Sequence, residues 1–230
     1  MTKSSFKPTY FLVGFIVLVL MDLATGSLEM TNWRHFTKPL ILLSLFAYFA
    51  LNGRALQRSI YLFMLAALFF SWLGDVMLMY EYISPMYFML GLGAFLTAHI
   101  MYLTAFLKRW NIRPGPLFWL VVIVLILYGC FLFWQLKDSL GNLLVPVVLY
   151  VLVILAMAVA SFGRKGMVTP KSFTMVFLGA LFFIVSDSVL AINKFTDSVP
   201  YAHILVMGTY ATAQYLITKG ILIQEDHQRS

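Results

Sequence analysis

The chain has 230 residues, of which 62% are hydrophobic, 17% aromatic and only 11% charged, and its mean hydropathy is +0.90. This composition is too apolar for a water-soluble globular domain and indicates an integral membrane protein. The formal net charge is +7, but the basic residues are scattered singly and in pairs, which argues against a nucleic-acid-binding patch. The single cysteine, Cys130, excludes an intrachain disulfide and a cysteine-based zinc site.

Apolar runs alternate with short polar gaps along the whole chain. Crossing a hydrocarbon core of about 30 Å takes roughly 20 helical residues, and turn-forming sequences such as "TGSLEMTN", "RPGP" and "DSVP" separate runs of that order. We therefore predict an all-α fold, a polytopic transmembrane bundle of about eight helices that forms one domain over residues 1–230. The predicted helices, of which the second is the shortest, cover residues 8–25, 37–51, 59–79, 85–107, 115–136, 142–162, 171–192 and 200–223.

The first predicted helix has a second interpretation. The stretch "KSSFKPTYFLVGFIVLVLM" also has the basic start and apolar core of a secretory signal, with "ATG" as a cleavage site. Cleavage would remove this helix and leave Asp22 at the cut, whereas the apolar run is long enough to cross a membrane. Asp22 and Lys38 lie near the outer ends of the first two helices, where we expect them to pair with each other or to extend toward the interface.

The distribution of Lys and Arg predicts the orientation of the bundle. With the N-terminus inside, four basic residues fall on the outer side: Arg34, Lys38, Lys137 and Lys194. The bias toward the inner side alternates correctly at every loop and predicts that both termini are cytoplasmic. The remaining twelve of the sixteen basic residues then fall on the cytoplasmic side: Lys3, Lys7, Arg54, Arg58, Lys108, Arg109, Arg113, Arg164, Lys165, Lys171, Lys219 and Arg229.

Two aspartates interrupt apolar helices. The third helix carries Asp75 within "LFFSWLGDVMLM", and the seventh carries Asp187 within "FFIVSDSVLAI". At 1.5 Å per residue, these side chains lie about 7 Å and 8 Å below the outer boundary. An ionised side chain in a bilayer costs about 2.5–3.5 kcal/mol on insertion scales, and such residues mark functional sites. We predict that the two carboxylates lie in one layer, face a common cavity and form a catalytic pair.

Further polar residues occur on the fourth and eighth helices. His99 lies about 21 Å from the outer end of the fourth helix, deeper than the aspartates, so we expect a supporting residue or a residue of the channel for a lipid tail. The spacing of His203, Tyr210 and Gln214 places them on one face of the eighth helix, directed into the bundle. The alternative role is packing for His99 and interhelical hydrogen bonding for Tyr210 and Gln214.

Five segments in order resemble the signature segments of the YhhN family of membrane proteins: "FTKPLILLSL" at 36–45, "SWLGDVMLM" at 71–79, "GAFLTAHIMYLTAF" at 93–106, "LGALFFIVSDSVLAINKF" at 178–195 and "YATAQYLI" at 210–217. The resemblance covers most of the chain from the second helix onward. The family includes lysoplasmalogenases, so it implies hydrolysis of the vinyl ether bond of lysoplasmalogens to a fatty aldehyde and glycerophosphoethanolamine or glycerophosphocholine. Some relatives lack the second acid of the SD motif, but this chain keeps both acids, and Ser186 beside Asp187 is a supporting residue.

The residues suit this chemistry. A vinyl ether is cleaved by acid, because protonation of the alkenyl carbon distal to oxygen gives an oxocarbenium ion that water captures. Two carboxyl groups in a low-dielectric site can hold a single proton, so one aspartate donates while the other stabilises the cation and activates water. We expect neither a metal nor another cofactor, since His99 has no second His or Cys at ligand spacing. The substrate would be a lysophospholipid from the bilayer, with Lys38 and His203 as phosphate partners.

Two other classes of protein stay open at this stage. A proton-coupled transporter also buries acids, and helices broken at Gly91, Gly93 or Pro146 would favour it. A purely structural membrane protein would leave the two acids unexplained, and no phosphate-binding loop indicates a nucleotide. The excess of Lys and Arg in the predicted cytoplasmic segments fits a bacterial inner membrane or, in a eukaryote, the membrane of the endoplasmic reticulum. The headgroup preferred, the identity of the acid and the oligomeric state do not follow from the sequence.

Overall fold

A computed structural model describes residues 8–28, 30–110 and 114–224, and these ranges are helical with short turns and contain no strand. The all-α prediction is confirmed. The basic residues Lys3, Lys7, Arg113 and Arg229, used above for orientation, lie outside the described residues. Within the described ranges the helices are α1 (Pro8–Ser27), α2 (Thr31–Asn52), α3 (Arg58–Met79), α4 (Pro85–Leu107), α5 (Pro116–Leu136), α6 (Leu144–Phe162), α7 (Pro170–Phe195) and α8 (Ala202–Leu222).

The second helix is longer than the sequence predicted. We expected it over residues 37–51, but α2 begins at Thr31 and continues through Pro39. Its first two turns contain Arg34 and His35, which face a cavity described below. Because these side chains are polar, they lower the local hydropathy, which therefore did not reveal the start of the helix.

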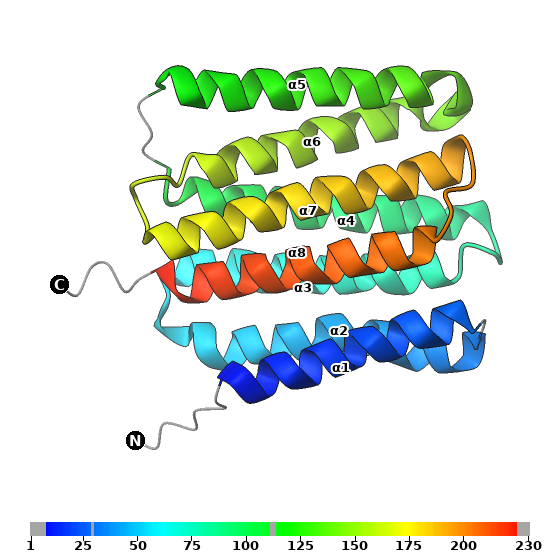
Figure 1. Ribbon diagram of the computed structural model, residues 1–230, viewed down its shortest axis with the longest axis horizontal. Helices are drawn as coiled ribbons and strands as arrows, with labels where there is room; N and C mark the ends of the chain where they lie inside the picture. The colour runs from blue at the N-terminus through cyan, green and yellow to red at the C-terminus, as the bar shows by residue number, and fades with distance from the viewer. Residues whose placement is uncertain (1–7, 29, 111–113, 225–230) are drawn as a thin grey trace.

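The helices run alternately up and down, so the start of α1 and the end of α8 lie at the same end of the bundle (Figure 1). We call this the terminal end. The opposite end, called the distal end, carries the connections from α1 to α2, α3 to α4, α5 to α6 and α7 to α8. In Figure 1, α5 forms one edge of the bundle, and α1 and α2 form the other.

Small residues allow the central helices to approach closely. A Cβ atom added at Gly179 of α7 would lie 3.0 Å from the Ala213 carbonyl oxygen of α8. A Cβ atom at Gly74 of α3 would lie 2.7 Å from the Phe95 ring of α4. Such contacts are typical of membrane helices, whose association depends on close packing because lipid is as apolar as the helix surface. These close contacts fix α7, which carries Asp187, against α8, and α3, which carries Asp75, against α4.

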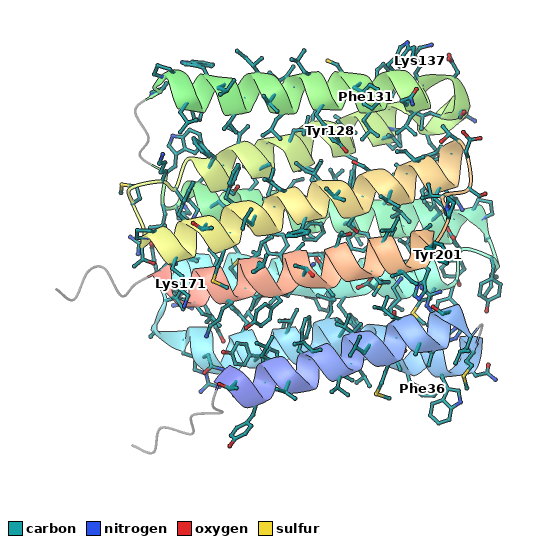
Figure 2. The ribbon with its side chains drawn as sticks, viewed as in Figure 1. Phe36, Tyr128, Phe131, Lys137, Lys171 and Tyr201 are labelled. Carbon is teal, nitrogen blue, oxygen red and sulfur yellow. The ribbon has the colours of Figure 1, made fainter. Side chains whose placement is uncertain are left out.

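Seven of the eight described helices are long and apolar enough to cross a membrane; α8 is the exception. It is similar in length, but Tyr210, Gln214 and Thr218 lower its hydropathy, and all three are buried. By contrast, apolar side chains project from the free face of α5 along its length (Figure 2). These polar side chains of α8 therefore face the interior of the bundle, as expected for polar groups in a membrane protein.

Candidate active site

Asp75 is held by side chains from two other helices. The Tyr210 hydroxyl of α8 donates a hydrogen bond of 2.8 Å to Asp75 Oδ2, and Lys38 Nζ of α2 lies 3.6 Å from Oδ1. Asp75 is 3% exposed. No basic residue lies near it in the sequence, yet the fold supplies a lysine as counter-ion. This pairing stabilises the ionised carboxylate.

Asp187 has different surroundings. The Tyr150 hydroxyl of α6 donates to Asp187 Oδ2 at 2.5 Å, and His99 Nε2 of α4 lies 3.7 Å from the same oxygen. Over the described ranges no Lys or Arg forms an ion pair with Asp187. Its side chain is 15% exposed and lines a cavity. Asp187 is therefore a carboxyl group without a fixed cation, next to a histidine.

The tautomer of His99 follows from its other contact. Nδ1 lies 2.7 Å from the Phe95 carbonyl oxygen, which can only accept, so Nδ1 carries the proton. In a neutral imidazole Nε2 then holds a lone pair, and this buried nitrogen has no hydrogen-bond partner. A lone pair and a carboxylate oxygen 3.7 Å apart repel unless a proton resides on one of them. The geometry suits a dyad that holds one proton and can release it.

The position of His99 differs from expectation. We predicted it well below the aspartates, but it lies beside Asp187. The reason is partly the length of α7, which continues to Phe195, so that Asp187 lies eight residues before its end, about 12 Å at helical rise. Phe183 packs against both His99 and Tyr210, with ring centroids 4.7 Å and 5.5 Å away. The partners of the two acids therefore meet at one aromatic ring.

The other predicted side chains support the helices around the acids. Tyr102 donates to Gln214 Oε1 at 2.5 Å, which joins α4 to α8. Ser186 donates to the Val206 carbonyl oxygen at 3.1 Å and joins α7 to α8. The hydrogen bonds of Gln214 and Ser186 thus join helices and do not involve either aspartate.

Two cavities open in the distal half. The first, called the chamber, has an empty volume of about 740 Å³ and lies between α4, α5, α6 and α7. Its lining is aliphatic and aromatic except for a few groups that include Tyr150 and Asp187. The second, called the vestibule, has an empty volume of about 1580 Å³, and both polar and apolar side chains of α2, α3, α7 and α8 line it. Leu78, Leu190 and Lys194 line both cavities and mark their junction.

Cationic side chains gather in the vestibule. Arg34 Nη2 lies 3.0 Å from His203 Nδ1, and because arginine has no lone pair, Arg34 is the donor. Arg34 Nε lies 3.9 Å from Asp22 Oδ1, which also accepts from Thr37 at 3.0 Å. We expected Asp22 to pair with Lys38 or to extend toward the interface; instead it is buried with Arg34 and Thr37, while Lys38 pairs with Asp75. The longer α2 explains this, since it adds Arg34 to the site.

Sequence reasoning missed three residues of this region. Tyr150 contacts Asp187, Arg34 contacts His203, and Lys194 lies at the junction of the cavities. One signal was available for Tyr150, because its hydroxyl is the only strongly polar group in the aliphatic stretch "VVLYVLV". Such a group inside a bundle needs a hydrogen-bond partner.

A sequence profile described as the YhhN family matches residues 33–221. The chain belongs to the YhhN family. The match covers α3 to α7 completely and α2 and α8 almost completely, whereas α1 with Asp22 lies outside it. Membership in this family confirms the resemblance seen in the five segments above.

Curated relatives of this YhhN-family chain carry a common name. "Lysoplasmalogenase TMEM86B" of Homo sapiens is 34% identical over 68% of this chain and 62% of its own length. "Lysoplasmalogenase TMEM86A" of Bos taurus is 34% identical over 65% of the chain and 61% of its own length, and "Lysoplasmalogenase" of Mycobacterium bovis is 29% identical over 58% and 50%. The matches thus span less than two thirds of these relatives. No solved structure matches the chain.

Proposed function

We propose that this protein is a lysoplasmalogenase, a hydrolase that cleaves the vinyl ether bond of lysoplasmalogens within the membrane. The observation that carries the proposal is the Asp187, His99 and Tyr150 cluster, which opens into an apolar chamber joined to a cationic vestibule. The names of the relatives support the same activity. No step of the reaction requires a metal or another cofactor.

The two cavities suit the two parts of such a lipid. The chamber suits an alkenyl chain because its lining is almost entirely aliphatic and aromatic. The headgroup would occupy the vestibule, where Lys38, Arg34 and His203 supply positive charge and hydrogen-bond donors for a phosphate. The vinyl ether, attached directly to glycerol, would then lie near the junction of the cavities, on the distal side of Asp187.

We assign the acid to Asp187. Its carboxyl group donates a proton to the alkenyl carbon distal to oxygen, and the double-bond electrons form the new C–H bond. The adjacent carbon becomes an oxocarbenium ion. The carboxylate left on Asp187 stabilises this cation, and the Tyr150 hydroxyl keeps that carboxylate in place.

Water completes the reaction. Its oxygen bonds to the cationic carbon while its proton passes to the Asp187 and His99 dyad. The resulting hemiacetal breaks its bond to the glycerol oxygen, which takes one proton, while the hemiacetal hydroxyl loses one. The products are a fatty aldehyde and a glycerophospho compound, and Asp187 regains its proton. One water is consumed.

Asp75 has the complementary role in this proposal. Its pairing with Lys38 and Tyr210 keeps it ionised throughout, so it is a fixed negative charge near the developing cation. It also holds Lys38 at the base of the vestibule for the phosphate. The two aspartates thus act together without sharing a proton directly.

The first test is substrate class. Purified protein in lipid nanodiscs should release aldehyde from a lyso vinyl ether lipid and leave the matching 1-alkyl ether intact, because a saturated ether cannot be protonated on carbon to give the cation. Equal cleavage of a 1-acyl analogue would indicate ordinary lipase chemistry. Proton flux into liposomes without hydrolysis would instead support a transporter.

We also propose an orientation in which the terminal end faces the cytoplasm, in a bacterial inner membrane or in the endoplasmic reticulum of a eukaryote. The excess of Lys and Arg at that end supports it. Single cysteines introduced in a C130S background, at Gln57 and at Asp138, test this orientation in intact cells. An impermeant maleimide should label only the cysteine at Asp138, and labelling of the other alone would reverse the orientation.

A further inference from the structure

Lys194 is the charged side chain at the junction of the two cavities. It lies near the end of α7 and lines both chamber and vestibule. Its Nζ donates to Glu81 Oε2 at 2.9 Å and lies 4.9 Å from the centroid of the Phe88 ring. Glu81 follows α3 and is the only carboxylate among the described residues that line the vestibule.

The ion pair between Lys194 and Glu81 is suited to exchange. Its side chains are 39% and 40% exposed, and exposed ion pairs contribute little to folding. The other vestibule cations have buried partners: Lys38 pairs with Asp75, and Arg34 with Asp22. Lys194 can therefore change partner without leaving a buried carboxylate uncompensated.

The proposed substrate carries one negative and one positive charge, which can pair with Lys194 and Glu81 respectively. If the tail lies in the chamber and the headgroup in the vestibule, as proposed above, the phosphate passes the junction where Lys194 lies. Beyond the phosphate, a zwitterionic headgroup carries an ammonium group. A phosphate anion and an ammonium cation match a lysine and a glutamate in turn, so both pairs of charges are satisfied when the lipid enters between them.

We propose that the Lys194 and Glu81 pair is the headgroup-recognition site for zwitterionic lysophospholipids and favours ethanolamine over choline. On binding, Lys194 Nζ moves to the phosphate oxygens and Glu81 takes the headgroup ammonium. A primary ammonium has three N–H donors, as Lys194 itself has, so it restores the charge-assisted hydrogen bond that Glu81 loses. A quaternary choline ammonium has no N–H donor and leaves Glu81 without that bond.

The test uses lipids that the protein cannot hydrolyse. Direct binding of 1-alkyl lysophosphoethanolamine and 1-alkyl lysophosphocholine to the purified full chain is measured for the wild type, E81Q and K194M. The wild type should prefer ethanolamine. E81Q should weaken ethanolamine binding about tenfold and choline binding less than about twofold, since a neutral amide oxygen then accepts from the ammonium in place of a carboxylate. K194M should weaken binding of both lipids about tenfold.

The matched control is D138N. Asp138 is also an exposed carboxylate at the distal end, paired with Lys137 at 2.7 Å, but it lines neither cavity. D138N should bind both lipids as the wild type does. An E81Q protein that kept the wild-type preference, or a D138N protein that lost it equally, would overturn the proposed site.

This inference rests on the proposed function, but the two fail separately. Wild-type protein that shows the expected preference, lost in E81Q, yet releases no aldehyde from the vinyl ether lipid would support the headgroup site and refute the hydrolase. Aldehyde release with the same headgroup preference in wild type and E81Q would refute the headgroup site alone.

Discussion

The two halves of the bundle place polar residues in different surroundings. At the terminal end, Arg164 is fully buried, donates to Ser172 and Gln224 at 3.1 Å and 2.9 Å, and packs over the Phe106 ring. It thereby connects the loop after α6 to α4, α7 and the end of α8. In the distal half, polar groups such as Asp187, Lys38 and Glu81 line cavities.

This difference explains where chemistry can occur. Arg164 lines neither cavity, and its hydrogen bonds and ring contact join the loop after α6 to neighbouring helices, so it stabilises one arrangement of helices. A polar group that lines a cavity is different, because a substrate or water in the cavity can contact it, as at Asp187. The distal half is therefore poised for a ligand, while the terminal half maintains the bundle around it. The predictions below separate these two roles.

The largest effect is expected from Asp187→Asn. Asparagine keeps the size of the side chain and can still accept from Tyr150, but it has no exchangeable acid proton. Aldehyde release should fall by about 10²–10⁴-fold, the usual contribution of a general acid or base. Thermal unfolding should be unchanged or shifted upward, because a costly acid is removed from the membrane interior. Retention of more than about a tenth of the activity would remove Asp187 from the mechanism.

The second prediction tests whether Lys38 stabilises Asp75 in its ionised form. Lys38→Met removes the counter-ion of a carboxylate that is 3% exposed, and breaking such a buried pair costs about 3–5 kcal/mol. Adding Asp75→Asn removes the uncompensated charge and should restore most of the lost stability. Unfolding in denaturant-titrated micelles measures both variants. If the double variant were as unstable as Lys38→Met alone, Asp75 would not be held as an ion by Lys38.

The helices were predictable from the sequence because hydropathy reports contact with lipid. The start of α2 was missed because Arg34 and His35 are polar and lower the local hydropathy. The acids Asp75 and Asp187 stood out because each is alone in an apolar stretch. Lys38, Tyr210 and His99 were identified as candidates, but the acid that each contacts was not. Tyr150 was missed, because only helix rotation and tilt place its hydroxyl beside Asp187. Local sequence does not encode those rotations, which depend on close contacts such as that of Gly179.

The third prediction tests those contacts. Gly179→Ala places a methyl group 3.0 Å from the Ala213 carbonyl oxygen and 2.8 Å from Ile217, so α7 and α8 must separate. Overpacking of this kind costs about 1–3 kcal/mol. The matched control is Gly208→Ala on α8, where the added Cβ would have no atom within 4 Å. Thermal unfolding should fall for the first variant only, and equal stability of the two would contradict close packing of α7 on α8.

The smallest effect comes from two matched hydroxyl groups, one in each half. Tyr128 donates to Ser188 Oγ at 2.7 Å beside the chamber, and Tyr61 donates to the Ala50 carbonyl oxygen at 3.0 Å near the terminal end. Replacing either by Phe should cost about 0.5–1.5 kcal/mol, the net value of one hydrogen bond. Only Tyr128→Phe should also change KM for the vinyl ether lipid, because Tyr128 lines the chamber proposed for the alkenyl chain. Equal KM values for the two variants would mean that the chain binds elsewhere.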